Sequence, residues 1–290
     1  MKISGFTFIK NAVSNDYPII EAINSILPIV DEMIVLVGDC TDGTLELIKS
    51  IENNKVKIHH SVWNKNLRSG GAVLADETNK ALQLISKESI WAFYIQADEV
   101  VHEKYHSTII DACKAYADNS KVEGLLFKYV HFYGTYDYVG DSRKWYQKEI
   151  RIIRNNINVE SYKDAQGFRK NDQKLFVKEI DAYMYHYGWV KSPEQMMKKN
   201  KNFGKLWHDD ESLKKFKETP DYFDYTNFDS ISKFKDTHPN VMLSRIEKKN
   251  WQLELDTNKK RFSLKNLILY YIEKRTGIRL FDYKNYKRLP

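Results

Sequence analysis

The chain has 290 residues, a net charge of +7 and a hydrophobic fraction of 42%, which suits one large folded domain, alone or with a substantial extension. No apolar run approaches the roughly 18 residues that a membrane-spanning helix needs, and the first residues lack the pattern of a signal peptide. Two cysteines, Cys40 and Cys113, form neither a metal-binding pattern nor a disulfide framework. We therefore expect a cytoplasmic protein.

The positive charge is concentrated at the C-terminal end of the chain. Residues 257–290 carry ten Lys or Arg against Glu273 and Asp282, so the rest of the chain is close to neutral. This distribution argues against a nucleic-acid groove through the main domain. The basic tail suits either attraction to anionic lipid headgroups or a solvated helix face, and both interpretations stay open.

Short apolar strands alternate with amphipathic helices over the first hundred residues. Strands are expected at 3–9, 33–37, 56–62 and 90–95; helices are expected from Pro18 to Pro28, at 45–51, and in a segment that ends near Ser86. This alternation predicts a parallel sheet with right-handed crossovers. No G-x-G-x-x-G follows the first strand and no P-loop occurs, which disfavours dinucleotide and P-loop nucleotide binding.

Longer strands and more aromatic residues characterise the second half of the chain. We expect strands at 122–132, 149–154 and 175–186, an irregular segment at 209–239, and helices at 102–117, 192–207, 240–251 and 263–275. The aromatic residues between 129 and 146 suit stacking against a sugar ring, although several of them would also fill a core.

Polar residues follow three of the predicted strands at the point where each strand ends. Lys10 and Asn11 follow the first strand, residues 39–44 follow the second, and residues 96–99 follow the fourth. Ligands of open α/β sheets bind at the carboxyl ends of such strands. Asp98 and Glu99 therefore lie where a divalent cation and a phosphate-bearing substrate are expected, unless they only cap the following helix.

These three motifs, in this order, resemble those of the family 2 glycosyltransferases, inverting enzymes of the GT-A fold. The bacterial branch that builds lipopolysaccharide and other surface glycans is the most similar. The second-strand motif of the family is typically an acid, a small residue, Ser or Thr, and Asp-Gly-Thr, which here stands as residues 39–44. The metal motif is usually Asp-Ala-Asp-Glu and here reads Gln-Ala-Asp-Glu at 96–99.

The resemblance covers about residues 1–200 and implies an α/β fold. The expected GT-A domain spans 1–208, with a Rossmann-like, mostly parallel sheet and helices on both faces. Residues 1–100 would form the nucleotide-sugar half and residues 101–208 the acceptor half. A mostly helical, basic extension would follow at 209–290.

The resemblance also assigns the side that binds a UDP- or GDP-sugar donor. Asp39 would accept a hydrogen bond from the base, and the backbone of Phe8 and Ile9 with Asn11 would complete the base and ribose pocket. Arg68 would contact the diphosphate, or else be a solvated loop residue. Gln96 and Ala97 of the metal motif complete the residues on the donor side.

Asp98 matches the acid that binds Mn²⁺ or Mg²⁺ in the family. Such a cation would stabilise the charge of a departing nucleoside diphosphate. His186 ends a strand where a histidine of related enzymes approaches the metal or the diphosphate, although a hydrogen-bonded core histidine is the alternative. Gln96 removes one acid from the motif and predicts weaker metal affinity, and Ala12 stands where a Glu is common.

An inverting transfer needs a general base for the acceptor hydroxyl, and Asp164 is the candidate, with Asp137 and Asp141 as alternatives. The acceptor would be a glycan or a lipid-linked glycan. Candidate residues on its side are Tyr136, Asp137, Trp145 and Arg151. For both Arg151 and Arg154, a structural role and a diphosphate contact stay open.

Two other functions remain open at this stage: a sugar nucleotidyltransferase, and a non-catalytic module that binds a glycan or a membrane. The tail from Arg261 to Leu280 places apolar residues at helical spacing beside basic ones. This apolar face would rest on a membrane surface, or pack on the main domain or on a second copy of the chain.

Overall fold

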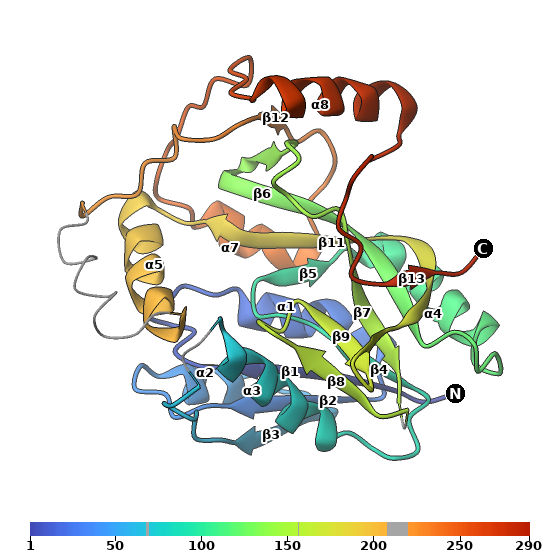
Figure 1. Ribbon diagram of the computed structural model, residues 1–290. Coiled ribbons are helices and arrows are strands. Elements are labelled where there is room, and N and C mark those ends of the chain that lie inside the picture. The colour runs from blue at the N-terminus through green and yellow to red at the C-terminus, as the bar shows by residue number, and fades with distance from the viewer. Residues whose placement is uncertain (68–69, 156, 208–219) are drawn as a thin grey trace.

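The computed structural model describes residues 1–67, 70–155, 157–207 and 220–290 (Figure 1). Its main sheet has ten strands in the described residues. Eight follow one another in the order β13 (Lys287–Arg288), β11 (Phe176–Val190), β6 (Gly124–Gly140), β7 (Lys148–Arg154), β4 (Trp91–Tyr94), β1 (Ile3–Ile9), β2 (Glu32–Val37) and β3 (Val56–His60). The other two are β12 (Ile231–Lys233), which pairs with β6, and β5 (Glu99–Val101), which pairs with β11.

Most neighbouring strands run parallel, as the alternation of strands and helices predicts. Strands β3, β2, β1 and β4 pair in parallel, and so do β6, β11 and β13. Strand β7 joins the two groups and is antiparallel to both β4 and β6. The expected mixed α/β fold with a mostly parallel sheet is confirmed.

Helices cover both faces of this sheet. On one face, α1 (Ile19–Ile26), α2 (Thr44–Lys49) and α4 (His106–Ala115) pack on residues such as Ile3 and Ile9 of β1. On the other face, α3 (Ala72–Gln83) packs on Phe6, Ile34 and Leu36. Alternate residues of a buried strand point to opposite faces, which is why these strands are apolar throughout. Short 3₁₀ turns, η1 (Leu27–Ile29) and η2 (Glu103–Tyr105), complete the connections.

A small antiparallel sheet lies beside α3, on the same face (Figure 1). It consists of β8 (Val159–Tyr162), β9 (Gly167–Lys170) and β10 (Gln173–Lys174), and the sequence analysis did not predict it. Asp164 therefore lies in the hairpin turn between β8 and β9. Lys163 and Ala165, on either side of it, have positive φ angles of 55° and 62°. Such backbone occurs mostly where the surroundings hold it, often at functional sites.

Several residues of the aromatic segment of β6 fill the core, as expected. Tyr129, Phe132, Tyr133 and Tyr138 are all buried in apolar clusters. These four side chains are therefore not available to stack against a sugar.

The C-terminal residues contribute both helices and strands. The helices are α5 (Pro193–Trp207), η4 (Asn240–Met242), α7 (Leu243–Glu247) and α8 (Leu264–Thr276). Helix α8 begins at the Ser263 cap and ends at Gly277, whose φ is 69°, as expected for a helix at 263–275. The helix expected at 240–251 is shorter. Since β12 and β13 are strands of the main sheet, the extension is joined to the domain, and the boundary at 208 and 209 falls outside the described residues. None of the described helices combines the length and apolar character needed to cross a bilayer.

Candidate functional site

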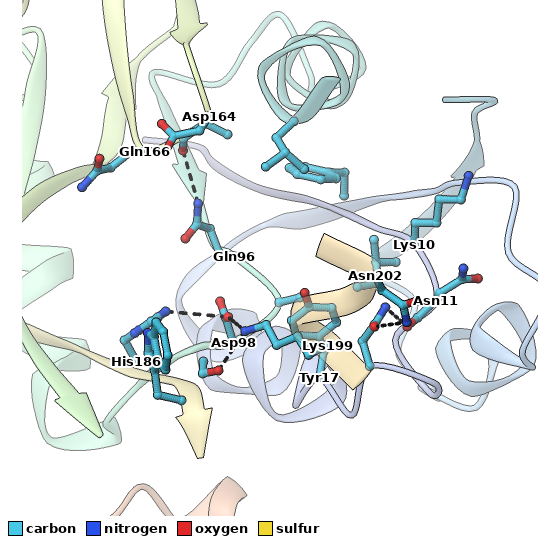
Figure 2. A pocket seen from close by; sticks show the side chains of 18 of the residues that line it. Lys10, Asn11, Tyr17, Gln96, Asp98, Asp164, Gln166, His186, Lys199 and Asn202 are labelled. Atoms are coloured by element: carbon cyan, nitrogen blue, oxygen red, sulfur yellow. Dashed lines mark hydrogen bonds and ion pairs between the residues drawn. The ribbon is translucent and has the colours of Figure 1, made fainter. Parts of the chain in front are cut away.

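A cavity of about 580 Å³ opens at the carboxyl ends of β1 and β4, where α5 and the β8–β9 turn complete its walls (Figure 2). Eight residues that the sequence analysis selected line it together: Phe8, Ile9, Asn11, Gln96, Ala97, Asp98, Asp164 and His186. The strand-end motifs after β1 and β4 therefore meet in one pocket, as their positions predict.

Asp98 is brought beside His186 by the pairing of β5 with β11. The backbone N–H of Tyr187 donates to the carbonyl of Asp98 at 2.8 Å, and Glu99 lies opposite His186 in the ladder. The alternative that Asp98 and Glu99 cap a helix is wrong, because Glu99 begins strand β5 and η2 is capped by His102. The carboxylate of Asp98 lines the pocket instead.

Glu99 points away from the pocket into the core, where it pairs with Arg151. The Nε and Nη2 atoms of Arg151 donate to the two carboxylate oxygens of Glu99 at 2.8 and 2.7 Å, and both side chains are fully buried. The hydroxyl of Tyr129 donates to Glu99 at 2.6 Å. Arg151 thus supports the floor below the site and does not line the pocket, where the sequence analysis had placed it as an acceptor contact.

A chain of hydrogen bonds orients the His186 ring. The Nε2 atom of His131 lies 2.8 Å from the carbonyl oxygen of Tyr146, which can only accept, so this nitrogen carries the hydrogen. Burial, reinforced by His186, holds the pKa of His131 well below its usual range, so the ring is neutral and its Nδ1 accepts from Nδ1–H of His186 at 3.1 Å. His131 therefore orients the His186 ring so that its Nε2 atom faces Asp98.

The space between Asp98 and His186 fits a divalent cation. The Oδ2 atom of Asp98 lies 3.7 Å from Nε2 of His186. Two ligands that each bind Mg²⁺ at about 2.1 Å can be up to about 4.2 Å apart, so one ion can contact both atoms. A Cβ atom at residue 188 would lie 2.6 Å from the first atom and 2.7 Å from the second, so Gly188 keeps this space open.

The protein alone supplies few ligands for such an ion. No group of three or more His, Cys, Asp or Glu side chains suited to a metal occurs in the part of the chain that the structure describes. The remaining ligands would have to be water or oxygens of a bound phosphate compound, which is a usual arrangement for Mg²⁺. The residues therefore fit a cation that binds together with such a compound.

Lys199 adds positive charge to the same part of the pocket. The Nζ atom of Lys199, from α5, lies 3.4 Å from Oδ2 of Asp98 (Figure 2). Although burial opposes the shift, the charges of His186 and Lys199 hold the pKa of Asp98 well below its usual range. Burial, with the charge of Lys199 nearby, lowers the pKa of Lys191 to about 7. Asp98 is therefore ionised, and the pocket around it suits an anionic ligand.

Asp39 lies behind the pocket wall and does not line it. Its Oδ1 accepts from Nζ of Lys10 at 2.6 Å and from the backbone N–H of Trp63 at 3.2 Å. Although burial opposes the shift, these hydrogen bonds lower the pKa of Asp39. Lys10, Trp63 and Phe8 line this end of the pocket, so Asp39 holds two residues of the pocket wall in place. Arg68 lies outside the described residues.

Asp164 stands on another side of the pocket from Asp98, with Gln96 between them (Figure 2). The side-chain amide of Gln96 donates to the backbone carbonyl of Ala165 at 3.3 Å and so ties the end of β4 to the β8–β9 turn. An aspartate at position 96, as in the motif that residues 96–99 resemble, could not donate this hydrogen bond. In the described residues no side chain pairs with the Asp164 carboxylate.

The other acceptor-side candidates do not line the main pocket. Tyr136 lines a second cavity of about 550 Å³, and Trp145 packs against His131 behind the wall. Asp137 accepts a hydrogen bond from Thr135 at 2.8 Å, and Asp141 accepts from Tyr270 at 3.0 Å. Arg154 donates to backbone carbonyls of residues 116–122, which makes it structural.

Several lining residues were missed by the sequence analysis: Tyr17, Gly188, Trp189 and Lys199. Gly188 is two residues from His186, and a small residue so close to a candidate ligand is the signal that could have found it. Lys199 is one of several lysines on α5, and nothing in the sequence distinguishes it from the others.

No protein-family model and no curated protein sequence matches the chain. Solved structures with a similar fold include residues 1–349 of TarS from S. aureus in complex with UDP: 20% identity, 69% of this chain and 64% of that one, TM-score 0.39. A second is glucosyl-3-phosphoglycerate synthase from Mycobacterium tuberculosis in complex with Mg²⁺ and UDP, with 19% identity, 45% and 43% of the two chains, and a TM-score of 0.30. A third is HddC from Yersinia pseudotuberculosis, with 15% identity, 70% and 100% of the two chains, and a TM-score of 0.36.

The likeness to these structures is distant. The chain spans 39% of the length of a longer TarS chain, and the identities and TM-scores are too low to establish an activity. The class that fold and pocket define is an α/β protein with a ligand site at the carboxyl ends of its parallel strands.

Proposed function

We propose that the chain is a glycosyltransferase that takes a sugar from a UDP- or GDP-sugar donor. More particularly, it would transfer that sugar with inversion to a glycan or lipid-linked acceptor in the synthesis of a surface polysaccharide. The observation that carries the proposal is the meeting of residues 8–11, Asp98 and Asp164 in one pocket at the ends of β1 and β4.

The pocket offers each part of such a donor a suitable partner. Phe8, Trp63 and the backbone around Ile9 and Asn11 form an apolar end with polar edges, which suits a nucleobase and ribose. Asp98 and His186 would hold Mn²⁺ or Mg²⁺, which when bound supplies positive charge for the diphosphate leaving group. Tyr146 and Trp189 line the same cavity and suit the apolar face of a sugar.

Asp164 takes the role of general base in this proposal. The acceptor hydroxyl oxygen forms a bond to the anomeric carbon while the bond from that carbon to the diphosphate oxygen breaks. The electron pair of the broken bond leaves on the diphosphate, and the hydroxyl proton passes to the Asp164 carboxylate. Attack from the face opposite the leaving group gives inversion.

Helix α8 would bring the protein to the membrane face where a lipid-linked acceptor lies. Leu264 and Ile268 are 80% and 60% exposed, so these two apolar side chains are not packed on the main domain. Lys265, Lys274 and Arg275 stand beside it, which suits an anionic lipid surface.

The experiment is a donor screen in which the released product identifies the reaction. A glycosyltransferase releases a nucleoside diphosphate, and Asp98→Asn should abolish most of that release. A sugar nucleotidyltransferase would instead release pyrophosphate when it is given a nucleoside triphosphate and a sugar 1-phosphate. A non-catalytic module would release neither product with any donor, and that result would contradict the proposal.

A further inference from the structure

The ammonium group of Lys199 lies beside the candidate metal ligands Asp98 and His186. Its Nζ lies 3.4 Å from Oδ2 of Asp98, and it donates to the backbone carbonyl oxygen of Gly188 at 2.8 Å. The ring of Tyr17 lies below it, with Nζ 5.1 Å from the ring centroid. The side chain is only 14% exposed, so these contacts hold it inside the pocket.

Lys199 and a divalent cation would use the same oxygen. Oδ2 of Asp98 faces both Nε2 of His186 and Nζ of Lys199. Gly188 likewise keeps open the space before Asp98 and His186, while its carbonyl accepts from Lys199. Since like charges repel strongly in a partly buried site, the ammonium disfavours a cation bound to the protein alone.

A diphosphate would change this balance because it offers Lys199 a stronger partner. Lys191 lies nearby, but it already donates to the backbone carbonyl of Asp16, so Lys199 is the lysine that pairs with Asp98. Lys199 is on a long, flexible side chain from α5, which allows its ammonium to move from a carboxylate to a phosphate oxygen. The freed Asp98 could then bind the cation.

We propose that Lys199 is an internal counter-ion of Asp98 that keeps the metal site closed until a nucleoside diphosphate group enters. This role rests on the proposed function, in which such a group is part of the donor. The cation and the diphosphate then bind cooperatively, and each raises the affinity for the other by the same factor. The free protein binds Mn²⁺ weakly for the same reason.

The test is calorimetric titration of the full chain with Mn²⁺ alone. Lys199→Met should tighten Mn²⁺ binding about tenfold or more, because the competing charge is gone, and Lys199→Gln should act in the same direction. The matched control is Lys198→Met, an exposed neighbour on α5 that does not line this pocket, which should behave as wild type. Adding Asp98→Asn to Lys199→Met should abolish the gained affinity.

Saturating UDP or GDP should tighten Mn²⁺ binding to the wild type much more than to Lys199→Met. Unchanged or weaker Mn²⁺ binding in both Lys199 variants, with thermal unfolding close to wild type, would overturn the proposal. Nucleoside diphosphate release by the wild type is measured separately. If the wild type releases nucleoside diphosphate but the Lys199 variants do not bind Mn²⁺ more tightly, only the counter-ion role is contradicted. If the variants bind Mn²⁺ more tightly but the wild type releases no nucleoside diphosphate from any donor, only the proposed function is contradicted.

Discussion

The Oδ2 atom of Asp98 and the Nε2 atom of His186 lie 3.7 Å apart, across a space that is open because residue 188 is a glycine without a side chain. Two segments meet there: the β4–β5 connection supplies the carboxylate, and β11 supplies both the imidazole and the glycine. The bulge in the β6–β11 register between His186 and Trp189 lies at the same place. A local irregularity of this kind often re-aims side chains next to a functional site.

Gly188→Ala should block this space without straining the backbone. The added methyl group would lie within 2.7 Å of both candidate ligand atoms, so we expect at least a tenfold loss of Mn²⁺ affinity and of donor turnover. Calorimetry and nucleoside diphosphate release measure the two effects, and thermal unfolding serves as the control for folding. Wild-type metal affinity in a folded Gly188→Ala protein would show that no cation binds here.

Asp164→Asn should slow glycosyl transfer by about 10²- to 10⁴-fold, the usual contribution of a general base. Donor binding should hardly change, because the substitution keeps the size and hydrogen-bonding shape of the side chain. Initial rates at saturating donor and acceptor check this.

The matched control is Asp137→Asn, since Asp137 is exposed, accepts a hydrogen bond from Thr135 and does not line the pocket. Its transfer rate should stay close to that of the wild type. An equal loss in both variants would remove Asp164 from the role of base.

The ends of the strands were predicted well from the sequence because the residues of these strands are buried on both faces of the sheet. Buried apolar strands fix where β1 and β4 end, so the polar residues 11 and 98 could be placed at one edge of the sheet. The adjacent acids at 98 and 99 could not be separated in this way. In the structure alternate residues of β5 face opposite sides, and Glu99 is paired with Arg151 in the core.

The rest of the site depends on contacts between distant segments. Lys199 reaches Asp98 across 101 positions of the chain, and His131 orients His186 across 55. Neither relationship leaves a local pattern in the sequence. The β8–β9 hairpin was missed for another reason: its turn uses Lys163 and Ala165 at positive φ, without the glycines that usually mark such a turn.

Arg151→Met should lower the free energy of unfolding by about 3–5 kcal/mol, because it leaves the Glu99 carboxylate buried and without its partner. The double variant Glu99→Gln/Arg151→Met should recover a large part of this loss. Urea denaturation of the single and double variants measures the coupling. Lys144→Met, which breaks a pair between an exposed lysine and Asp229, is the control and should have little effect.

Glu149 predicts a stability that falls as the pH rises. Burial raises its pKa to about 7 from the ordinary 4.5, against the opposing charge of Arg151, and its Oε2 has no hydrogen-bond partner among the described residues. The folded state thus holds a proton that the unfolded state has lost between about pH 4.5 and 7. Over this range stability should fall by about 3 kcal/mol and then level off.

Glu149→Gln should remove this dependence, since the amide stays neutral at every pH. The variant should gain stability over the wild type at pH 8 and gain little at pH 5. Urea unfolding at the two pH values checks both signs. If the free energy of unfolding changed by the same amount between pH 5 and pH 8 in the wild type and in the variant, Glu149 would be ruled out as the cause.

The exposed face of α8 predicts binding to anionic lipid. The helix lies at the end of the molecule remote from β3 (Figure 1), and Leu264 and Ile268 point to solvent. Leu264→Glu/Ile268→Glu should weaken sedimentation with phosphatidylglycerol vesicles, because it removes apolar contact and adds repulsion from the lipid. These point changes are better than truncating the tail, since truncation would also remove β13 from the sheet. Binding of the wild type should fall with added salt and with neutral vesicles. If the wild type bound no vesicles but dimerised through this face, a second copy of the chain would be the partner of the face.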